Sequence, residues 1–440
     1  MDVQIRPSNG LQGVITPPPD KAICHRLVLL AALADGVTDI APWPAAEDCR
    51  RTLELVQRLG VAVERTGFGV QIRGRPQGFA PADAALDCGA SGTTLRLAAG
   101  VLAGQPFRSV LAADDSLSAR PMRRIVEPLT AMGVQIQGRA DPASGDIHPP
   151  LTIHGRRPLR AIRYELPVAS AQVKSAILLA ALAADGPTTV VERTATRDHT
   201  ERALRRFGAD VRQDGLEIVL FPGRLRAPGA CAVPGDPSSA AFFVAAAACV
   251  PGSSLEVRGV GCNPSRLGFV RVLARMGAQI TVKAPDNGWE PLGTLRVAAA
   301  PLRATSVEAD EVAALIDELP VLMVAAAAAR GTSTFRGVRE LRVKETDRVR
   351  SMVQGLQAFG AQVRLLGEDG VAITGGALHR GDVEGAGDHR TVMSLAVAAL
   401  LAGDGPSVVR GAEAVAKSYP EFFDHLQAVA GPSASGGVPI

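Results

Sequence analysis

Nine short polar strings interrupt an otherwise Ala- and Leu-rich chain, and each lies next to a segment that we predict to be a buried helix. The N-terminus of a helix offers free N–H groups and the positive end of a dipole, which suits the binding of anions. The strings supply eight cations from both halves of the chain, namely Lys21, Arg26, Arg120, Arg197, Lys344, Arg348, Arg390 and Lys417. So many cations at helix starts indicate ligands that carry several phosphates and carboxylates.

Two further features of these strings concern hydrogen-bond donors. Gly92 lies at a predicted helix start in the string DCGASGTTLRL, where the lack of a side chain lets the backbone approach a ligand closely. A plain helix cap explains that string about equally well. Ser170, Gln172 and Lys174 bring a hydroxyl, an amide and an ammonium together in the string VASAQVKSA.

Two carboxylates could supply acid–base catalysis. Asp317 breaks an apolar run in the string LIDELP, where burial of a carboxylate is costly unless it is paired or functional. Glu345 lies in the string RELRVKETDRVR, and on a helix Lys344, Glu345 and Arg348 would share one face. A surface lattice of salt bridges is the alternative for this string. Walker, Rossmann and clustered metal-ligand motifs are absent from the sequence, so a kinase or dehydrogenase lacks its signature.

The composition favours a globular protein of two domains, because 440 residues exceed one ordinary core. A net charge of +3 argues against a general nucleic-acid binder. Six cysteines without CxxC spacing favour reduced thiols. The start of the chain has no apolar stretch typical of a signal peptide, and no apolar segment reaches the ~18 residues of a membrane helix. We therefore expect a cytoplasmic protein without a membrane or nucleic-acid partner.

Internal repeats dominate the organisation of the chain. One unit is an amphipathic helix that ends in Gly and is followed by a strand; the glycines are Gly60, Gly133, Gly208, Gly277 and Gly360. A second unit is an Ala-rich helix, a Gly turn and a β-branched strand. Ala on all faces predicts a helix surrounded by protein. About six copies indicate three per domain, with a boundary near residues 225–235. A solenoid without an active site is the alternative, which the polar strings argue against.

The strings, taken in order, resemble those of the EPSP synthase (3-phosphoshikimate 1-carboxyvinyltransferase) family. The motifs that carry the resemblance are PxxDKxIxHR, GxSGTTxRL, SLxxRPM, ASAQVKSA, TRDHTE, LIDExP, ELRVKETDR and DHR, over roughly residues 10–425. The resemblance implies an α/β (α+β) fold, a two-lobed inside-out barrel of six βαβαββ-type units with three per lobe, which closes on its substrates. We expect an N-terminal lobe of residues 16–228 and a C-terminal lobe of residues 1–15 and 229–440.

The activity that the resemblance implies is transfer of the enolpyruvyl group of phosphoenolpyruvate to the 5-hydroxyl of shikimate 3-phosphate, in chorismate and aromatic amino acid biosynthesis. No metal or organic cofactor is implied, and we expect a monomer. By position, Lys21, Arg120 and Lys417 would hold the donor phosphate, near Gly92 and Gln172. Arg348 and Arg390 would clamp the donor carboxylate, beside His389, which is counted among the catalytic residues.

The remaining assignments concern the acceptor and the chemistry. By position, the residues around the acceptor would be Arg26, Ser170, Ala171, Gln172, Arg197, Asp317 and Lys344. Glu345 would work at C3 of phosphoenolpyruvate, Asp317 would act as base for the hydroxyl, and Lys21 would assist proton transfer.

The chain departs from the family pattern at a few positions. Ala22 replaces a Ser that contacts the acceptor carboxylate, Ala90 replaces an Asn, and Pro19 replaces a Gly. Every donor-side residue is intact, whereas the changes include a contact to the acceptor. A specialised paralog that acts on another cyclic or nucleotide hydroxyl is therefore the alternative. A UDP-N-acetylglucosamine acceptor is disfavoured, because residues 114–119 contain no Cys. Gly92 stands where tolerant forms carry Ala, which is compatible with sensitivity to glyphosate and leaves that question to an inhibition curve.

Overall fold

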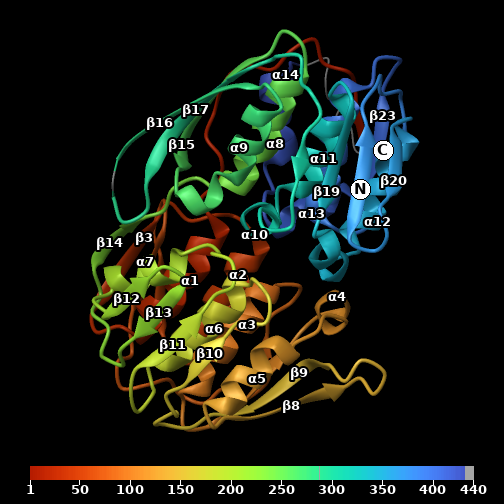
Figure 1. Ribbon diagram of the computed structural model, residues 1–440. Coiled ribbons are helices and arrows are strands. Elements are labelled where there is room, and N and C mark those ends of the chain that lie inside the picture. The colour runs from red at the N-terminus through yellow and green to blue at the C-terminus, as the bar shows by residue number, and fades with distance from the viewer. Residues whose placement is uncertain (287, 432–440) are drawn as a thin grey trace. The chain divides into compact units, whose positions relative to one another are not determined.

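The computed structural model describes residues 1–286 and 288–431. The chain divides into two compact units. The N-lobe consists of Pro19–Val233, and the C-lobe combines Met1–Pro18 with Pro234–Ile440. Each lobe contains three repeats (Figure 1). Five of the six have the order β-α-β-α-β-β, and the last repeat of the C-lobe has a three-stranded sheet.

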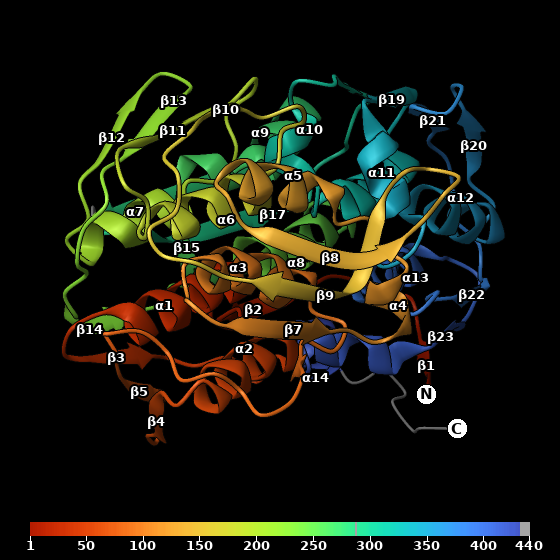
Figure 2. The same cartoon turned by 90° about the horizontal axis from the view of Figure 1, so that it is seen from below.

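The second repeat of the N-lobe shows this order in full. Its elements are β6 (Leu86–Asp87), α3 (Gly92–Ala103), β7 (Arg108–Ala112), α5 (Arg123–Ala131), β8 (Gln135–Ala140) and β9 (Ile147–His154), with the short α4 (Asp115–Ser118) before α5. The sheet order is β6-β7-β9-β8. β6 is parallel to β7, and the other pairs are antiparallel. Figure 2 shows β7, β9 and β8 side by side.

The other two N-lobe repeats follow the same plan. One contains β10 (Arg163–Glu165), α6 (Ala171–Ala181), β11 (Thr188–Val191), α7 (His199–Arg206), β12 (Val211–Asp214) and β13 (Glu217–Leu220). The other contains α1 (Lys21–Leu33), β3 (Val37–Ala41), α2 (Glu47–Arg58), β4 (Ala62–Arg65) and β5 (Val70–Arg73). Its parallel edge strand is β14 (Gly229–Ala232), which comes from the far end of the lobe and pairs with β3.

The C-lobe repeats also borrow strands from a distant part of the chain. In the first, β2 (Gln12–Ile15) pairs in parallel with β15 (Ser254–Gly261), and the remaining elements are α8 (Pro237–Cys249), η1 (Pro264–Arg266), α9 (Gly268–Arg275), β16 (Gln279–Asp286) and β17 (Leu292–Ala298). The second has β18 (Ser306–Val307), α10 (Val312–Leu315), α11 (Leu319–Ala328), β19 (Thr332–Arg336), η2 (Val338–Val343), α12 (Arg348–Ala358), β20 (Gln362–Leu365) and β21 (Gly370–Thr374).

The last repeat is completed by the N-terminal strand of the chain. Its own elements are β22 (Asp382–Glu384), α13 (His389–Leu401), β23 (Ser407–Arg410), η3 (Ala412–Lys417) and α14 (Phe422–Ala430). β1 (Asp2–Ile5) pairs antiparallel with β23, which gives a three-stranded sheet of order β1-β23-β22. The predicted architecture of six repeats, three per lobe, is therefore confirmed in the described part of the chain.

The two helix types behave as their sequences predict. The five glycines after the amphipathic helices have φ between 80° and 99°, the left-handed conformation that favours glycine. The Ala-rich helices are enclosed: every residue of α8 from Pro237 to Ala248 is buried. None of the helices within residues 1–286 and 288–431 combines the length and hydropathy that a membrane crossing requires. All six cysteines lie in this part of the chain and are free thiols.

Small residues allow the buried helices of the N-lobe to pack closely. A Cβ added at Gly100 of α3 would lie 2.2 Å from the carbonyl oxygen of Ala176 on α6. Since real Cβ atoms do not approach an oxygen so closely, only glycine permits this helix pair. The contact holds α3 against α6, and the predicted ligand-binding residues lie at the starts of these two helices.

Candidate active site

Helix α1 brings Lys21 to its first position. The sequence predicts a helix from Leu27, and this is wrong: the helix begins six residues earlier, and Asp20 caps it by accepting a hydrogen bond of 3.0 Å from Ile23 N. Lys21 Nζ lies 2.7 Å from Asp48 Oδ2 of α2, and both side chains are mostly buried. The carboxylate holds the ammonium at the start of the helix, where an anion is favoured.

Two guanidinium groups lie over Gly92, the first residue of α3. A Cβ added at Gly92 would lie 2.6 Å from Nη1 of Arg96 and 2.9 Å from Nη1 of Arg120. Ser91 caps the helix by accepting from Thr94 N. The start of α3 therefore combines the positive end of the helix dipole with two cations, as an anion site requires.

The start of α6 is joined to the start of α3 by hydrogen bonds. Ser170 is the N-cap of α6, followed by Ala171 and Gln172. Gln172 Nε2 donates to Thr93 Oγ1 at 3.0 Å, and Arg96 Nη1 donates to Gln172 Oε1 at 3.0 Å. The structure thus brings together the predicted residues Gly92, Arg120, Ser170, Ala171 and Gln172.

Arg26 lies inside helix α1 and is only 3% exposed. Its Nε donates to Thr200 Oγ1 at 2.6 Å, and its Nη2 donates to Ser175 Oγ at 2.9 Å. These bonds link α1 to α6 and to α7. Arg197 is half-buried on the segment that leads into α7, three residues before Thr200.

The neighbour of Arg26, His25, is fully buried beside this cluster. Its Nδ1 lies 2.6 Å from Thr52 Oγ1. Burial, followed by the charges of Lys21 and Arg26, lowers the pKa of His25 well below its usual value. His25 is therefore neutral at physiological pH.

Arg348 is the centre of the charged cluster in the C-lobe. Its side chain is 2% exposed and contacts three carboxylates: Nε lies 2.7 Å from Asp388 Oδ2, Nη2 2.5 Å from Glu345 Oε2 and Nη1 3.4 Å from Asp317 Oδ1. Burial opposes the charged form, but the three carboxylates outweigh it and raise the pKa of Arg348 above its usual value. Both predicted acid–base carboxylates therefore share one guanidinium.

The start of α13 adds three more predicted residues to this cluster. Arg390 Nε lies 3.3 Å from Asp317 Oδ1, and its Nη1 donates to the Asp317 carbonyl oxygen at 3.2 Å. Lys417 Nζ donates to the carbonyl oxygen of Gly387 at 2.9 Å, directly before the cap of α13. His389 is the first residue of α13 and is 3% exposed.

The predicted helical face of Lys344, Glu345 and Arg348 is wrong. Residues 344–347 lie between η2, which ends at Val343, and α12, which begins at Arg348, with Asp347 as its N-cap. Glu345 nevertheless contacts Arg348, the first residue of α12. Lys344 lies directly before Glu345 and is half-buried.

Three residues of these clusters were given no role from the sequence. Asp48 pairs with Lys21, Arg96 bridges Gly92 and Gln172, and Asp388 pairs with Arg348. Arg96 carried a usable signal, because an Arg between two Leu residues of a buried helix needs a partner. Asp48 had none, since its partner lies 27 residues away in the sequence.

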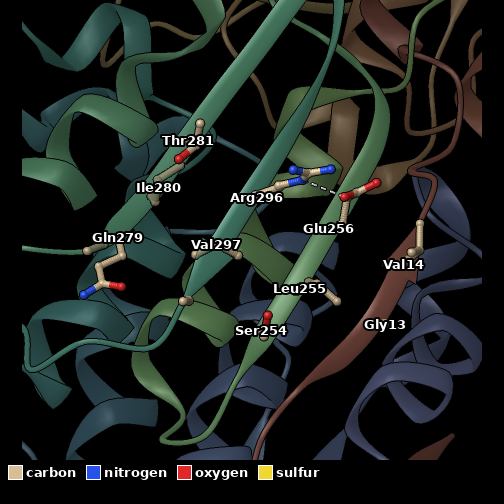
Figure 3. A pocket seen from close by; sticks show the side chains of 12 residues that line it. Gly13, Val14, Ser254, Leu255, Glu256, Gln279, Ile280, Thr281, Arg296 and Val297 are labelled. Atoms are coloured by element: carbon tan, nitrogen blue, oxygen red, sulfur yellow. Dashed lines mark hydrogen bonds and ion pairs between the residues drawn. The ribbon is translucent and has the colours of Figure 1, made fainter.

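A hollow on the C-lobe contains none of the predicted residues. It lies on the sheet formed by β2, β15, β17 and β16 (Figure 3). Its charged side chains, Arg296 and Glu256, pair with each other at 2.7 Å. Because this pair neutralises itself, the hollow lacks the converging cations that a phosphate ligand requires.

Comparison with known proteins identifies the fold and then the family. The fold is that of the enolpyruvyl transferases: the crystal structure of the enolpyruvyl transferase NikO from Streptomyces tendae has a TM-score of 0.78 at 18% identity, and covers 97% of each chain. At that identity the likeness concerns the fold alone. The structure of EPSP synthase from Acinetobacter baumannii has a TM-score of 0.84 at 40% identity, and covers 97% of this chain and 98% of that one.

The sequence relatives agree with this structural likeness. The profile of EPSP synthase (3-phosphoshikimate 1-carboxyvinyltransferase) matches residues 5–426. The 3-phosphoshikimate 1-carboxyvinyltransferase of Shouchella clausii is 43% identical over 424 residues, which are 96% of this chain and 97% of the relative. The chain belongs to the EPSP synthase family.

Proposed function

We propose that this enzyme transfers the enolpyruvyl group of phosphoenolpyruvate to the 5-hydroxyl of shikimate 3-phosphate and releases phosphate. The observation that carries the proposal is the position of Arg348, which holds both candidate acid–base carboxylates beside a second guanidinium, that of Arg390. A cation pair suits a ligand carboxylate, and the adjacent carboxylates suit proton transfer. The match to the family over residues 5–426 supports the same reaction.

The donor is held at its two anionic ends. Arg348 and Arg390 bind the carboxylate of phosphoenolpyruvate, and Lys21, Arg120 and Lys417 bind its phosphate. Lys21, Arg348 and Arg390 lie in the first turns of α1, α12 and α13, where the positive ends of the helix dipoles add to their charges, as oxyanion binding requires.

Glu345 protonates C3 of phosphoenolpyruvate. A ligand carboxylate that takes over the Arg348 guanidinium displaces Glu345 from it and adds a negative charge nearby. That change favours the protonated form of Glu345. Protonation at C3 makes C2 cation-like, and C2 is then open to attack by the acceptor hydroxyl.

Asp317 accepts the proton of that hydroxyl, and the tetrahedral adduct forms at C2. The adduct loses phosphate, which takes up the proton held by Asp317 and is stabilised by Lys21 as it leaves. Glu345 takes a proton back from C3 to restore the double bond. His389 lies next to Arg390 at the start of α13, where it supports the same charged cluster.

The acceptor is bound by Ser170, Ala171 and Gln172 at the start of α6, by Arg197 before α7, and by Lys344. Arg26 acts on the same side, from its position between α1, α6 and α7. Since Ala22 lacks the hydroxyl that the family uses against the acceptor carboxylate, Arg26 carries more of this contact. We also propose a monomer that acts in the cytoplasm; light scattering during size-exclusion chromatography tests the oligomeric state.

Phosphate release tests the function. The assay compares shikimate 3-phosphate, unphosphorylated shikimate and UMP as acceptors, each with phosphoenolpyruvate. We expect release with shikimate 3-phosphate alone. Release with a different acceptor, and none with shikimate 3-phosphate, would reject the proposed acceptor and favour a specialised paralog.

A further inference from the structure

A lysine and two glutamates are buried together in the N-lobe, and the chemistry proposed above uses none of them. The side chains of Lys174, Glu192 and Glu201 are 1%, 2% and 0% exposed. Lys174 Nζ lies 2.9 Å from Glu192 Oε2 and 2.6 Å from Glu201 Oε1. Buried ion pairs often stabilise a protein no more than apolar residues of the same volume. The cluster therefore calls for an explanation other than stability.

The two glutamates lie at the two ends of the segment that carries Arg197. Glu192 directly follows β11, and Glu201 is the third residue of α7. Because Lys174 contacts both glutamates, one ammonium group joins the two ends of this segment. Arg197 lies between the two anchored ends.

A second contact of Glu192 transmits this anchoring to Arg197. Glu192 Oε1 accepts a hydrogen bond of 3.2 Å from Thr196 N and one of 2.5 Å from Thr196 Oγ1. Both oxygens of the Glu192 carboxylate are thus engaged, one on Lys174 and the other on the residue that precedes Arg197. A carboxylate held at both oxygens has little freedom to rotate.

Lys174 also connects this segment to the start of α6. Its backbone N donates to Ser170 O at 3.1 Å, so it lies one turn after the N-cap. The adjacent Ser175 Oγ lies 2.6 Å from Thr200 Oγ1, which ties α6 to α7 a second time. The start of α6 and the Arg197 segment are therefore joined by several ion pairs and hydrogen bonds.

We propose that Lys174 is a positioning residue for acceptor binding: through Glu192 and Thr196, it fixes Arg197 relative to the start of α6. The inference deepens the proposed function and rests on it, because Arg197 and Gln172 are there assigned to the phosphorylated acceptor. Lys174 itself touches no substrate. Its effect falls on recognition of the acceptor and spares the donor, whose cations lie on other elements.

Steady-state kinetics of Lys174→Met and Thr196→Val test the proposal. Lys174→Met removes the ammonium group that joins Glu192 to Glu201 at the two ends of the segment. Thr196→Val removes only the hydroxyl that binds Glu192. Misplacement of a binding group by about 1 Å can cost up to about a hundredfold, so we expect the KM for shikimate 3-phosphate to rise about tenfold or more in Lys174→Met. We expect a smaller rise in Thr196→Val, with the KM for phosphoenolpyruvate within about twofold of wild type in both.

The matched control is Ile177→Val, which removes one buried methyl group from the same helix and leaves the cluster intact. It should leave both KM values unchanged. Amide hydrogen exchange, read by mass spectrometry without substrate, provides a second measurement. We expect faster exchange over residues 192–198 in Lys174→Met and Thr196→Val, and wild-type exchange there in Ile177→Val.

The outcomes separate this inference from the proposed function. If the wild-type enzyme releases no phosphate with shikimate 3-phosphate, the proposed function fails, whereas hydrogen exchange still reports on the Arg197 segment. A folded Lys174→Met with unchanged acceptor KM, or with both KM values raised equally, would overturn the inference. If Lys174→Met does not fold, Thr196→Val decides in the same way.

Discussion

Replacement of Gly92 by Ala places a methyl group under the two guanidinium groups at the start of α3. The added Cβ would lie 2.6 Å from Arg96 Nη1 and 2.9 Å from Arg120 Nη1, whereas ordinary contacts begin at 3.4 Å. The two nitrogens must therefore retreat by about 0.8 Å and about 0.5 Å. Both are the far ends of flexible side chains, and the backbone at Gly92 suits an L-residue. We expect the variant to fold with an unchanged Tm.

The cost of the substitution falls on the anion site. A charge-assisted hydrogen bond contributes about 1.5–3 kcal/mol. A shift of Arg120 by half an ångström loses a part of this, and a loss of about 1.4 kcal/mol corresponds to tenfold weaker binding. We therefore expect the KM for phosphoenolpyruvate to rise about tenfold, with a kcat within about threefold of wild type.

Initial rates of phosphate release at varied phosphoenolpyruvate concentration measure this effect. Gly67→Ala is the matched control, because a Cβ there meets nothing within 4 Å and φ is not positive. A Gly92→Ala enzyme whose KM for phosphoenolpyruvate stays within twofold of wild type would refute the role of Arg120 at the donor phosphate. The same pair of variants tests whether the wild-type enzyme is sensitive to glyphosate and whether Gly92→Ala is less so.

Three further perturbations follow from the charged and buried groups. Glu345→Gln should lower kcat by about 10²–10⁴-fold with little change in Tm, measured as single-turnover phosphate release; near-normal turnover would exclude Glu345 from proton transfer. Asp388→Ala should be less stable than Asp388→Asn by about 1 kcal/mol in urea unfolding. Both variants remove the carboxylate that pairs with Arg348, but only Asn keeps the cap of α13, so equal stabilities would contradict the capping role. The pKa of His25 is lowered, so His25 stays neutral in the folded protein, whereas the unfolded chain takes up a proton below about pH 6.5. The free energy of unfolding should therefore decrease as the pH is lowered, by about 1.4 kcal/mol at one pH unit below that value. Thermal unfolding at pH 7.5 and 5.5 checks this: a His25→Asn variant should lose less stability than wild type, and an equal loss would argue against the buried neutral imidazole.

The repeats could be predicted because their signals are local. An Ala-rich helix and a Gly after an amphipathic helix are visible within about fifteen residues. The partners of the edge strands carried no such signal. β14 pairs with β3 and β2 pairs with β15 across most or all of the N-lobe sequence, and edge strands of four residues leave little pattern to match.

The site was predicted in residue type more fully than in conformation. The start of α1 was placed too late because Lys21, His25 and Arg26 look like loop residues. All three are helical, and His25 and Arg26 are buried, since Asp48, Thr52 and Thr200 provide partners that are distant in sequence. Tertiary partners of this kind override local polarity.

The borrowed strands have a consequence for synthesis on the ribosome. β2 leaves the ribosome before any of the N-lobe, yet its partner β15 is made about 240 residues later, which at 5–20 residues per second is about 12–48 s. The interval between synthesis of β1 and synthesis of its partner β23 is longer still, because β23 begins at Ser407. The N-lobe is contiguous from Pro19 to Val233 and can fold during that interval. The first eighteen residues are therefore synthesised first but belong to the lobe that is completed last. Any fusion or trimming at the N-terminus acts on the C-lobe.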